Sequence, residues 1–278
     1  MKFLNHKVEK VNQNPGIEGI FEIIEKAGRV CYKSEPKQGI TSKEFVDRLI
    51  KSNHLSPLEH GTVYLSVFIG SPLEDEGYLD KTDFVRFFSK NKYSKVVHEK
   101  ITSDILEAPV SYNGYRITTN YRVIIENLDD IGDWQQYLDD IPQKLHKKRH
   151  TFLVNTNIGV TREMNRHRTF SICEQSTRYC NFAKDKFGNE IAFCTLDVIP
   201  TKLQEFLQNV ENFYMTSIEK GVTPEIARML LPLCTATTAI YTAFDEDWQH
   251  YLDLRLYGST GKPHPEIKKI AEQISLGL

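Results

Sequence analysis

The segment from Arg166 to Tyr179, with the sequence RHRTFSICEQSTRY, has the highest density of side chains suited to binding chemistry. It carries three arginines and one glutamate, interleaved with hydroxyl, amide and aromatic side chains. A guanidinium group can bind two oxygens of a phosphate at once, and serine, glutamine and glutamate can hydrogen bond to the edge of a base. We therefore predict a local anion-binding site here; the alternative is a solvated basic loop.

Two further arginines lie in apolar surroundings. Arg228 is the only charged residue between positions 226 and 244. Arg255 is expected on the apolar face of a helix, at spacings of seven, four and three residues from Trp248, Tyr251 and Leu252. A cation on an apolar face needs a ligand, an acidic partner or water. Instead of binding a ligand, Arg228 could form a salt bridge with Glu225, and Arg255 could form one with Asp253. Each arginine could also lay its aliphatic stem along the apolar surface and place its guanidinium in solvent.

Other chemistry is less well supported by the sequence. The segment His54–His60, HLSPLEH, contains two histidines and a glutamate, but their spacing is neither that of a helical zinc site nor that of a zinc finger, so no metal is predicted. Cys173 and Cys180 are interpreted as small buried side chains. Neither a GxGxxG nor a GxxxxGK loop is present, which excludes the two commonest loop-based modes of nucleotide binding.

Composition limits the class of protein. The 278 residues have a formal net charge of −2 and are 40% hydrophobic, which is typical of a globular chain. A protein without excess positive charge lacks the field that attracts a polyanion, so we expect no nucleic-acid partner. Five cysteines without a CxxC pair indicate a reducing, cytoplasmic location. Arg228 and Pro232 interrupt the one long apolar stretch, so no membrane segment is expected.

Hydrophobic periodicity predicts strands early and helices late in the chain. Strands are expected at 62–69, where Val63, Leu65, Val67 and Ile69 share one face, and at 150–155. Helices are expected at 17–27, 42–52, 203–218, 224–231, 245–256 and 265–276. The charged stretch 73–149 is interpreted as an insertion with a strand at 121–125 and a helix at 133–138. These elements favour an α+β fold, with a mostly antiparallel sheet and packed helices, in a single domain over 1–278.

The motifs resemble one enzyme family. Arg166-His167-Arg168, seven further residues and then Ser176 match the RHR-x7-S signature of the flavin-dependent thymidylate synthases. Three more segments resemble motifs of that family in the same order: His54–His60, Gly221–Leu233 with its GVxxExARxxLP pattern, and Leu252–Arg255 with LxLR. The resemblance covers most of 52–68 and 150–272 and leaves 73–149 without much counterpart.

The resemblance implies a homotetramer that converts dUMP to dTMP, with FAD held at subunit interfaces and with 5,10-methylenetetrahydrofolate and NADPH as co-substrates. Arg255 would be catalytic, beside the uracil ring. The implied dUMP-binding residues are Glu163, Arg166, Glu174, Gln175, Ser176, Thr177, Arg178, Arg228 and Arg255. The implied FAD-binding residues are His60, Thr62, Arg166, His167, Arg168, Glu174 and His250.

Departures from the family pattern concern the flavin more than the nucleotide. His250 and Phe244 occupy positions that are often polar flavin contacts, and Glu163 stands where glutamine is frequent. No histidine or lysine is placed by the sequence to activate Ser176, so we predict that it orients substrate and is not a nucleophile. Two alternatives remain open: a flavin- or folate-linked methyltransferase for another uracil, such as one in RNA, and a module that binds nucleotides or single-stranded RNA.

Overall fold

The computed structural model describes residues 1–278 except 37, 71–77, 104–109, 186–187 and 196–198. The described chain forms two compact units. Unit 1 comprises residues 1–11, 26–38 and 150–278, and unit 2 comprises 12–25 and 39–149. Helix α1 (Gly16–Tyr32) contributes residues to both. The stretch 73–149 therefore lies wholly in unit 2, and its interpretation as an insertion into a single domain stays a prediction.

Unit 1 is built around a four-stranded sheet in the order β2–β6–β9–β7. Its strands are β2 (Lys7–Val11), β6 (Arg149–Asn157), β7 (Ser171–Glu174) and β9 (Ala236–Phe244). β2 pairs with β6, and β7 with β9, in antiparallel register. A separate parallel pair joins β1 (Lys2–Leu4) to β8 (Ala192–Cys194). The expected α+β class with mostly antiparallel pairing is confirmed, and the strand predicted at 150–155 is β6.

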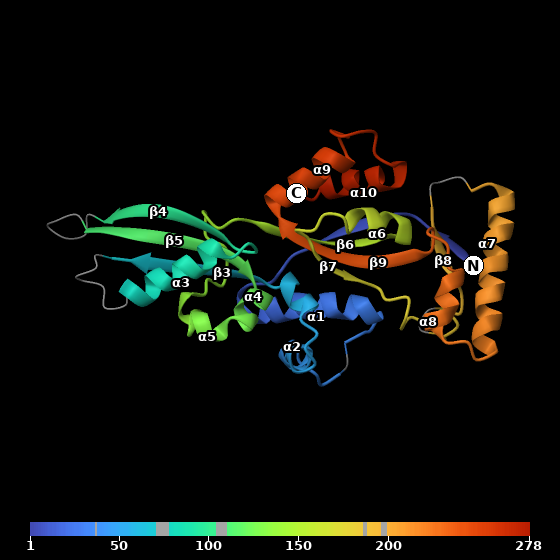
Figure 1. Ribbon diagram of the computed structural model, residues 1–278, viewed down its shortest axis with the longest axis horizontal. Helices are drawn as coiled ribbons and strands as arrows, with labels where there is room; N and C mark the ends of the chain where they lie inside the picture. Colours follow the sequence, from blue (N-terminus) through green and yellow to red (C-terminus); the bar gives the residue numbers. More distant parts are fainter. Residues whose placement is uncertain (37, 71–77, 104–109, 186–187, 196–198) are drawn as a thin grey trace. The chain divides into compact units, whose positions relative to one another are not determined.

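Helices cover the faces of this sheet. α6 (Ile158–Met164), α9 (Asp245–Arg255) and α10 (Pro265–Ser275) lie on one face, as Figure 1 shows. There Phe152 of β6 and Tyr241 of β9 pack with Trp248 of α9 in one buried cluster. On strand β9 the next side chain, Ile240, points the other way and packs with Ala27 of α1. Strand β9 is therefore buried on both faces, and this packing holds it in place. It pairs with β7, the strand that follows the RHR motif.

A smaller cluster lies where α7 (Thr201–Glu219) and α8 (Pro224–Ala227) pack near β8. The short 3-10 turn η4 (Arg228–Leu230) follows α8 directly. Among the apolar residues that recur at three- and four-residue spacing along α7, Leu207 and Tyr214 are fully buried. Leu203, Phe206 and Phe213 are 42, 56 and 68% exposed. The predicted helix is confirmed, but part of its apolar face is exposed to solvent.

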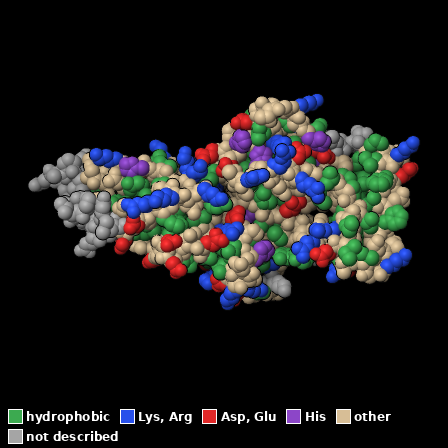
Figure 2. All heavy atoms as spheres, viewed as in Figure 1, with side chains coloured by type: hydrophobic (Ala, Val, Ile, Leu, Met, Phe, Trp, Pro, Cys, Tyr) green, Lys and Arg blue, Asp and Glu red, His purple; other side chains and the backbone are tan. Residues whose placement is uncertain are grey.

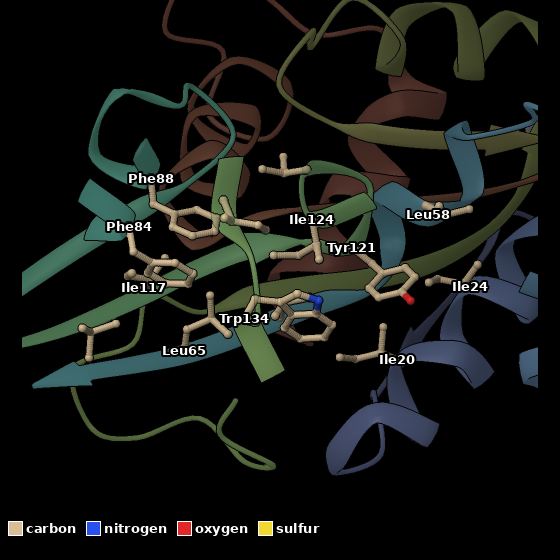
Figure 3. Close-up of a cluster of buried hydrophobic side chains, with 14 of the residues drawn as sticks. Ile20, Ile24, Leu58, Leu65, Phe84, Phe88, Ile117, Tyr121, Ile124 and Trp134 are labelled. Carbon is tan, nitrogen blue, oxygen red and sulfur yellow. The ribbon is translucent and has the colours of Figure 1, made fainter. Parts of the chain in front are cut away.

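Unit 2 contains a three-stranded antiparallel sheet in the order β3–β5–β4. Its strands are β3 (Thr62–Ile69), β4 (Lys95–Ser103) and β5 (Val110–Asn120). Its helices and turns are α2 (Ser42–Lys51), η1 (Ser56–His60), α3 (Tyr78–Lys90), α4 (Tyr121–Glu126), α5 (Leu128–Ile131) and η2 (Trp134–Tyr137). The predicted face of β3 is confirmed: Leu65 is buried in the core drawn in Figure 3, beside Ile117, Phe88 and Trp134.

Two element predictions in unit 2 are wrong. Residues 121–125 form helix α4 and not a strand, because the Asn120 side chain caps the helix by accepting a hydrogen bond from the Val123 N–H at 3.1 Å. Residues 133–138 form only the single turn η2, after which Leu138 continues in extended form and pairs with Leu65. In the first place a side-chain cap, and in the second a pairing with a distant strand of the same chain, outweighs the local propensities of the side chains.

None of the described helices combines the length and the apolar character that crossing a lipid bilayer requires.

Candidate active site

Arg255 lies in the last turn of α9 and is held by residues of the α6 region. Its Nη1 donates to Oε2 of Glu163 at 3.2 Å, its Nη2 to the Glu163 carbonyl oxygen at 3.4 Å, and its Nε to Nε2 of His167 at 3.3 Å. The acidic partner is therefore Glu163, and the alternative pair with Asp253 is wrong. The Arg255 side chain is mostly buried, with 18% of its surface exposed. A planar cation is thus fixed in orientation at the edge of solvent.

His167 is kept neutral by its surroundings. Burial, and then the positive charge of Arg255, lower its pKa to about 4. Because Arg255 donates to Nε2, the ring proton of the neutral form is assigned to Nδ1. The ring stacks on Phe170 at 5.5 Å between centroids, which fixes its plane. His167 therefore acts as an acceptor that orients Arg255 and is not a second cation in the site.

Glu174, the last residue of β7, is held by three side-chain donors. Thr161 Oγ1 donates to its Oε1 at 2.7 Å, Thr237 Oγ1 to the same oxygen at 3.4 Å, and Asn165 Nδ2 to Oε2 at 3.3 Å. The donors come from α6, from the residue that follows it and from β9. The carboxylate is therefore anchored to two elements of the unit 1 core.

The turn after β7 is fixed by backbone hydrogen bonds. The Gln175 N–H donates to the carbonyl oxygen of Thr238 at 2.8 Å, and the Ser176 N–H to that of Cys31 at 2.9 Å. Ser176 Oγ accepts a hydrogen bond from the Arg178 N–H at 3.2 Å. The hydroxyl thus contacts a backbone N–H and not a basic side chain that could activate it, which agrees with an orienting role for Ser176.

Arg178 and Arg228, two further arginines predicted to bind an anion, are exposed. Arg228, in η4, directs Nη1 toward Thr177 Oγ1 at 3.5 Å. Arg178 pairs through Nε with Glu225 at 3.1 Å, and the two side chains are 49% and 59% exposed. The sequence alternative that paired Glu225 with Arg228 is therefore wrong. Surface ion pairs of this kind are weak, so a phosphate could displace Glu225 from Arg178.

The predicted residues divide between two adjoining pockets of unit 1. The first, of about 650 Å³, is lined by Asn165, Glu174, Gln175, Ser176, Thr177 and Arg228, among others. The second, of about 550 Å³, is lined by Arg166, His167, Arg168, Thr169, Asp247, His250, Leu254, Arg255 and Thr260. Asn165 lines the first and Arg166 the second, so the chain after α6 forms part of both walls. Glu163 and Arg178 are not among the lining residues, although each bonds to the site as described above.

The two pockets have different chemistry. The first combines the carboxylate of Glu174 with the cations of Arg162 and Arg228 and several hydroxyl and amide groups. The second has three arginines and one carboxylate, Asp247. The excess positive charge of the second pocket favours an anionic ligand. The first pocket favours a ligand that has an anionic end and a hydrogen-bond donor at another point.

His60 and Thr62 belong to unit 2, where both are buried. Arg149 Nη1 donates to Thr62 Oγ1 at 3.1 Å, and Arg149 Nη2 to the Glu59 carbonyl oxygen at 3.0 Å. Burial, followed by the charge of Arg149, lowers the pKa of His60 to about 3. The assignment of these two residues to FAD stays a prediction.

The sequence missed the residues that support the site. Thr161, Thr237 and Tyr241 lie on regular elements and carry no motif, and they reach Glu174 or Asn165 only because α6 packs on β9. Asn165 directly precedes the RHR motif, which was the one available signal.

Cys173 and Cys180 are buried, in agreement with their interpretation as small core side chains. Among the described residues, no group of three or more histidine, cysteine, aspartate or glutamate side chains could hold a metal ion.

Comparison with known proteins identifies relatives of this chain. Residues 145–276 match the family model described as "Thymidylate synthase complementing protein". A probable flavin-dependent thymidylate synthase of Paramecium bursaria Chlorella virus 1 is 27% identical over 139 residues, which are 45% of this chain and 64% of the viral protein. The flavin-dependent thymidylate synthase of Thermotoga neapolitana is 33% identical over 110 residues, which are 38% of this chain and 51% of that protein.

A longer match is found with the flavin-dependent thymidylate synthase of Aquifex aeolicus. It is 23% identical over 273 residues, which are 84% of this chain and 85% of the Aquifex protein. The matches to the viral and Thermotoga proteins span less than two thirds of those proteins. Together these findings confirm the resemblance to the flavin-dependent thymidylate synthases that the sequence motifs indicated.

Proposed function

We propose, on the premise that residues 145–276 are homologous with the flavin-dependent thymidylate synthases, that this protein reductively methylates dUMP to dTMP. 5,10-Methylenetetrahydrofolate would donate the carbon and NADPH would supply electrons through FAD. The observation that carries this proposal is the pair of adjoining pockets built from the RHR segment, one of mixed charge and one rich in arginine.

The first pocket is the proposed site of dUMP. Arg228 and Arg178 would bind the phosphate, with the side chains of Gln175, Ser176 and Thr177 around it, because guanidinium, amide and hydroxyl groups can all donate to phosphate oxygens. Glu174 would accept a hydrogen bond from the sugar or base. Glu163, through its contact with Arg255, and Arg166, which lines the second pocket, complete the proposed set.

Arg255 is the proposed catalytic group. A uracil that gains negative charge at its O2/N3 edge is stabilised by a fixed cation that is partly shielded from water. The contacts with Glu163 and His167 would hold the guanidinium in place for that purpose. Because His167 is neutral, it does not compete with Arg255 for this negative charge.

The donors of the second pocket fit FAD. Arg166 and Arg168 could neutralise a pyrophosphate, and His167 and His250 offer ring surfaces and N–H groups, with centroids 6.1 Å apart. The family resemblance adds Glu174, which lines the first pocket, and His60 and Thr62, which lie in unit 2. When bound, FAD would supply the redox chemistry, and the protein would hold flavin and pyrimidine close together and exclude water.

We further propose a homotetramer with sites at subunit interfaces. Figure 2 shows hydrophobic side chains gathered over α7. Leu203, Phe206, Val210 and Phe213 recur there at spacings of three, four and three residues, the spacing of a helix-packing seam. Three of them are exposed, which is typical of a surface that another subunit covers. A cytoplasmic location, and the absence of a nucleic-acid or membrane partner, belong to the same proposal.

The proposed reaction is tested by incubating the purified protein with dUMP, methylenetetrahydrofolate, NADPH and FAD and detecting dTMP by mass spectrometry. We expect dTMP only in the complete mixture. Methylation of UMP or of a short uracil-containing RNA, with no dTMP formed, would contradict the assignment. Sedimentation of the same sample would test the tetramer separately.

A further inference from the structure

A hydrogen-bond chain runs from the core of unit 1 into the first pocket. The Tyr241 hydroxyl donates to Oδ1 of Asn165 at 3.0 Å, and Nδ2 of Asn165 donates to Oε2 of Glu174 at 3.3 Å. Tyr241 is fully buried, whereas Asn165 and Glu174 line the pocket. The chain therefore connects a rigid strand, β9, to a carboxylate that a ligand can reach.

The direction of this chain is fixed by its ends. If the Asn165 amide were flipped, its Oδ1 would face the Glu174 carboxylate, and two acceptors would oppose each other without a proton between them. The buried phenol would meanwhile lose its acceptor, which is costly for a buried donor. The arrangement in which Tyr241 donates and Asn165 passes the donation on satisfies all three groups.

We propose that Tyr241 and Asn165 are positioning residues that aim the Glu174 carboxylate and so fix the orientation of the nucleotide in the first pocket. This inference rests on the proposed function, in that it takes dUMP as the ligand. Thr161 and Thr237 bind the other carboxylate oxygen, Oε1, so donors on both sides prevent the carboxylate from rotating.

A carboxylate aimed in this way gives the pocket a polarity. Glu174 repels a phosphate and accepts an N–H or O–H, whereas Arg228 on the same pocket attracts a phosphate. A nucleoside monophosphate satisfies both kinds of group when its phosphate faces Arg162 or Arg228 and a donor of its sugar or base faces Glu174. If Glu174 rotated, that end of the pocket would lose its preference for a donor, and the nucleotide would bind less tightly and in more than one way.

The test is a double-mutant cycle on dUMP affinity, measured by titration calorimetry with the full-length protein. Tyr241→Phe removes only the hydroxyl, and Glu174→Gln removes the charge and replaces one acceptor oxygen with an NH2 donor. We expect Tyr241→Phe to weaken dUMP binding about three- to tenfold, the effect of one net hydrogen bond. In the Glu174→Gln background the same change should have less than a twofold effect, because Tyr241 then has no carboxylate to aim.

Two variants separate positioning from general stability. Tyr214→Phe removes the hydroxyl of another fully buried tyrosine, in the cluster near α7, and should leave dUMP affinity unchanged. Asn165→Asp places a second carboxylate beside Glu174, so it should weaken binding more than Tyr241→Phe does. That loss should shrink as the pH falls toward 5. Asn165 is exposed, so this variant should fold even if Tyr241→Phe does not.

The outcomes divide clearly. Equal losses from Tyr241→Phe with and without Glu174→Gln, or no loss at all, would overturn the positioning role. If the wild-type protein binds no dUMP, the proposed function fails, and a crystal structure of Tyr241→Phe decides the inference by itself. We then expect a rotated Glu174 carboxylate, and an unchanged one would overturn the inference.

Discussion

The contacts of Arg255 allow the effect of one conservative substitution to be calculated. Arg255→Lys keeps the positive charge, but an ammonium group can replace only one of the three hydrogen bonds, most directly the one to the Glu163 carboxylate. The bonds to Nε2 of His167 and to the Glu163 carbonyl are then lost. At about 0.5–1.5 kcal/mol each, they amount to about 1–3 kcal/mol of positioning energy. If this energy is expressed in the transition state, kcat/KM falls about 5- to 150-fold.

The assay for this prediction is the initial rate of dTMP formation at several dUMP concentrations, with the melting temperature measured in parallel. Arg86→Lys is the matched control, because Arg86 forms an exposed pair with Asp83 on α3 of unit 2 and should change neither quantity. The reasoning is refuted if folded Arg255→Lys has a kcat/KM within twofold of the wild-type value.

Three further changes test other parts of the site. Ser176→Ala should retain activity with kcat/KM reduced no more than about tenfold, because only an orienting hydrogen bond is lost; complete loss in a folded protein that binds dUMP would instead indicate a nucleophile. The depressed pKa values of His60 and His167 mean that the folded state resists protonation while the unfolded state accepts a proton near pH 6.5. Above pH 6.5 the two histidines do not change the free energy of unfolding, and as the pH falls from 6.5 toward 4 they lower it. The urea concentration at the unfolding midpoint should therefore fall over this range, and it should fall less in His60→Gln. The same decrease with pH in the wild type and in His60→Gln would contradict this. Cys180→Ala should lower the free energy of unfolding by about 1 kcal/mol, since Cys180 is fully buried, without changing kcat; an inactive but folded variant would show that the thiol takes part in the reaction.

Residue types and spacing were enough to locate the candidate site. The cluster of arginines in the RHR segment and the apolar face under Arg255 both reflect local constraints that a sequence displays directly. A cation three and four residues from buried side chains must point along the same helix face, and Trp248, Tyr251 and Leu252 are indeed buried. The strand at 62–69 was predictable for the same reason, because alternation is a local property of the chain.

What the sequence could not provide depends on contacts between distant segments. The partner of Arg255 is Glu163, 92 positions away, and not the neighbouring Asp253. The donors to Glu174 come from α6 and β9, so they become visible only once the sheet is assembled. Residues 121–125 have strand-forming side chains, but they form a helix because the Asn120 side chain caps its first turn. The apolar face of α7 illustrates a further limit, because a periodic pattern shows that a face is apolar and not which surface covers it.

The central claim is tested most directly by release of tritium from dUMP labelled at C5. Replacement of that hydrogen by the transferred carbon frees the label into water, so the assay follows the reaction at the reacting atom. We predict release and equal dTMP formation when methylenetetrahydrofolate, NADPH and FAD are all present, and no dTMP when either NADPH or FAD is omitted. No release under any combination, from a protein that binds both dUMP and FAD, would contradict the assignment of thymidylate synthesis to this site.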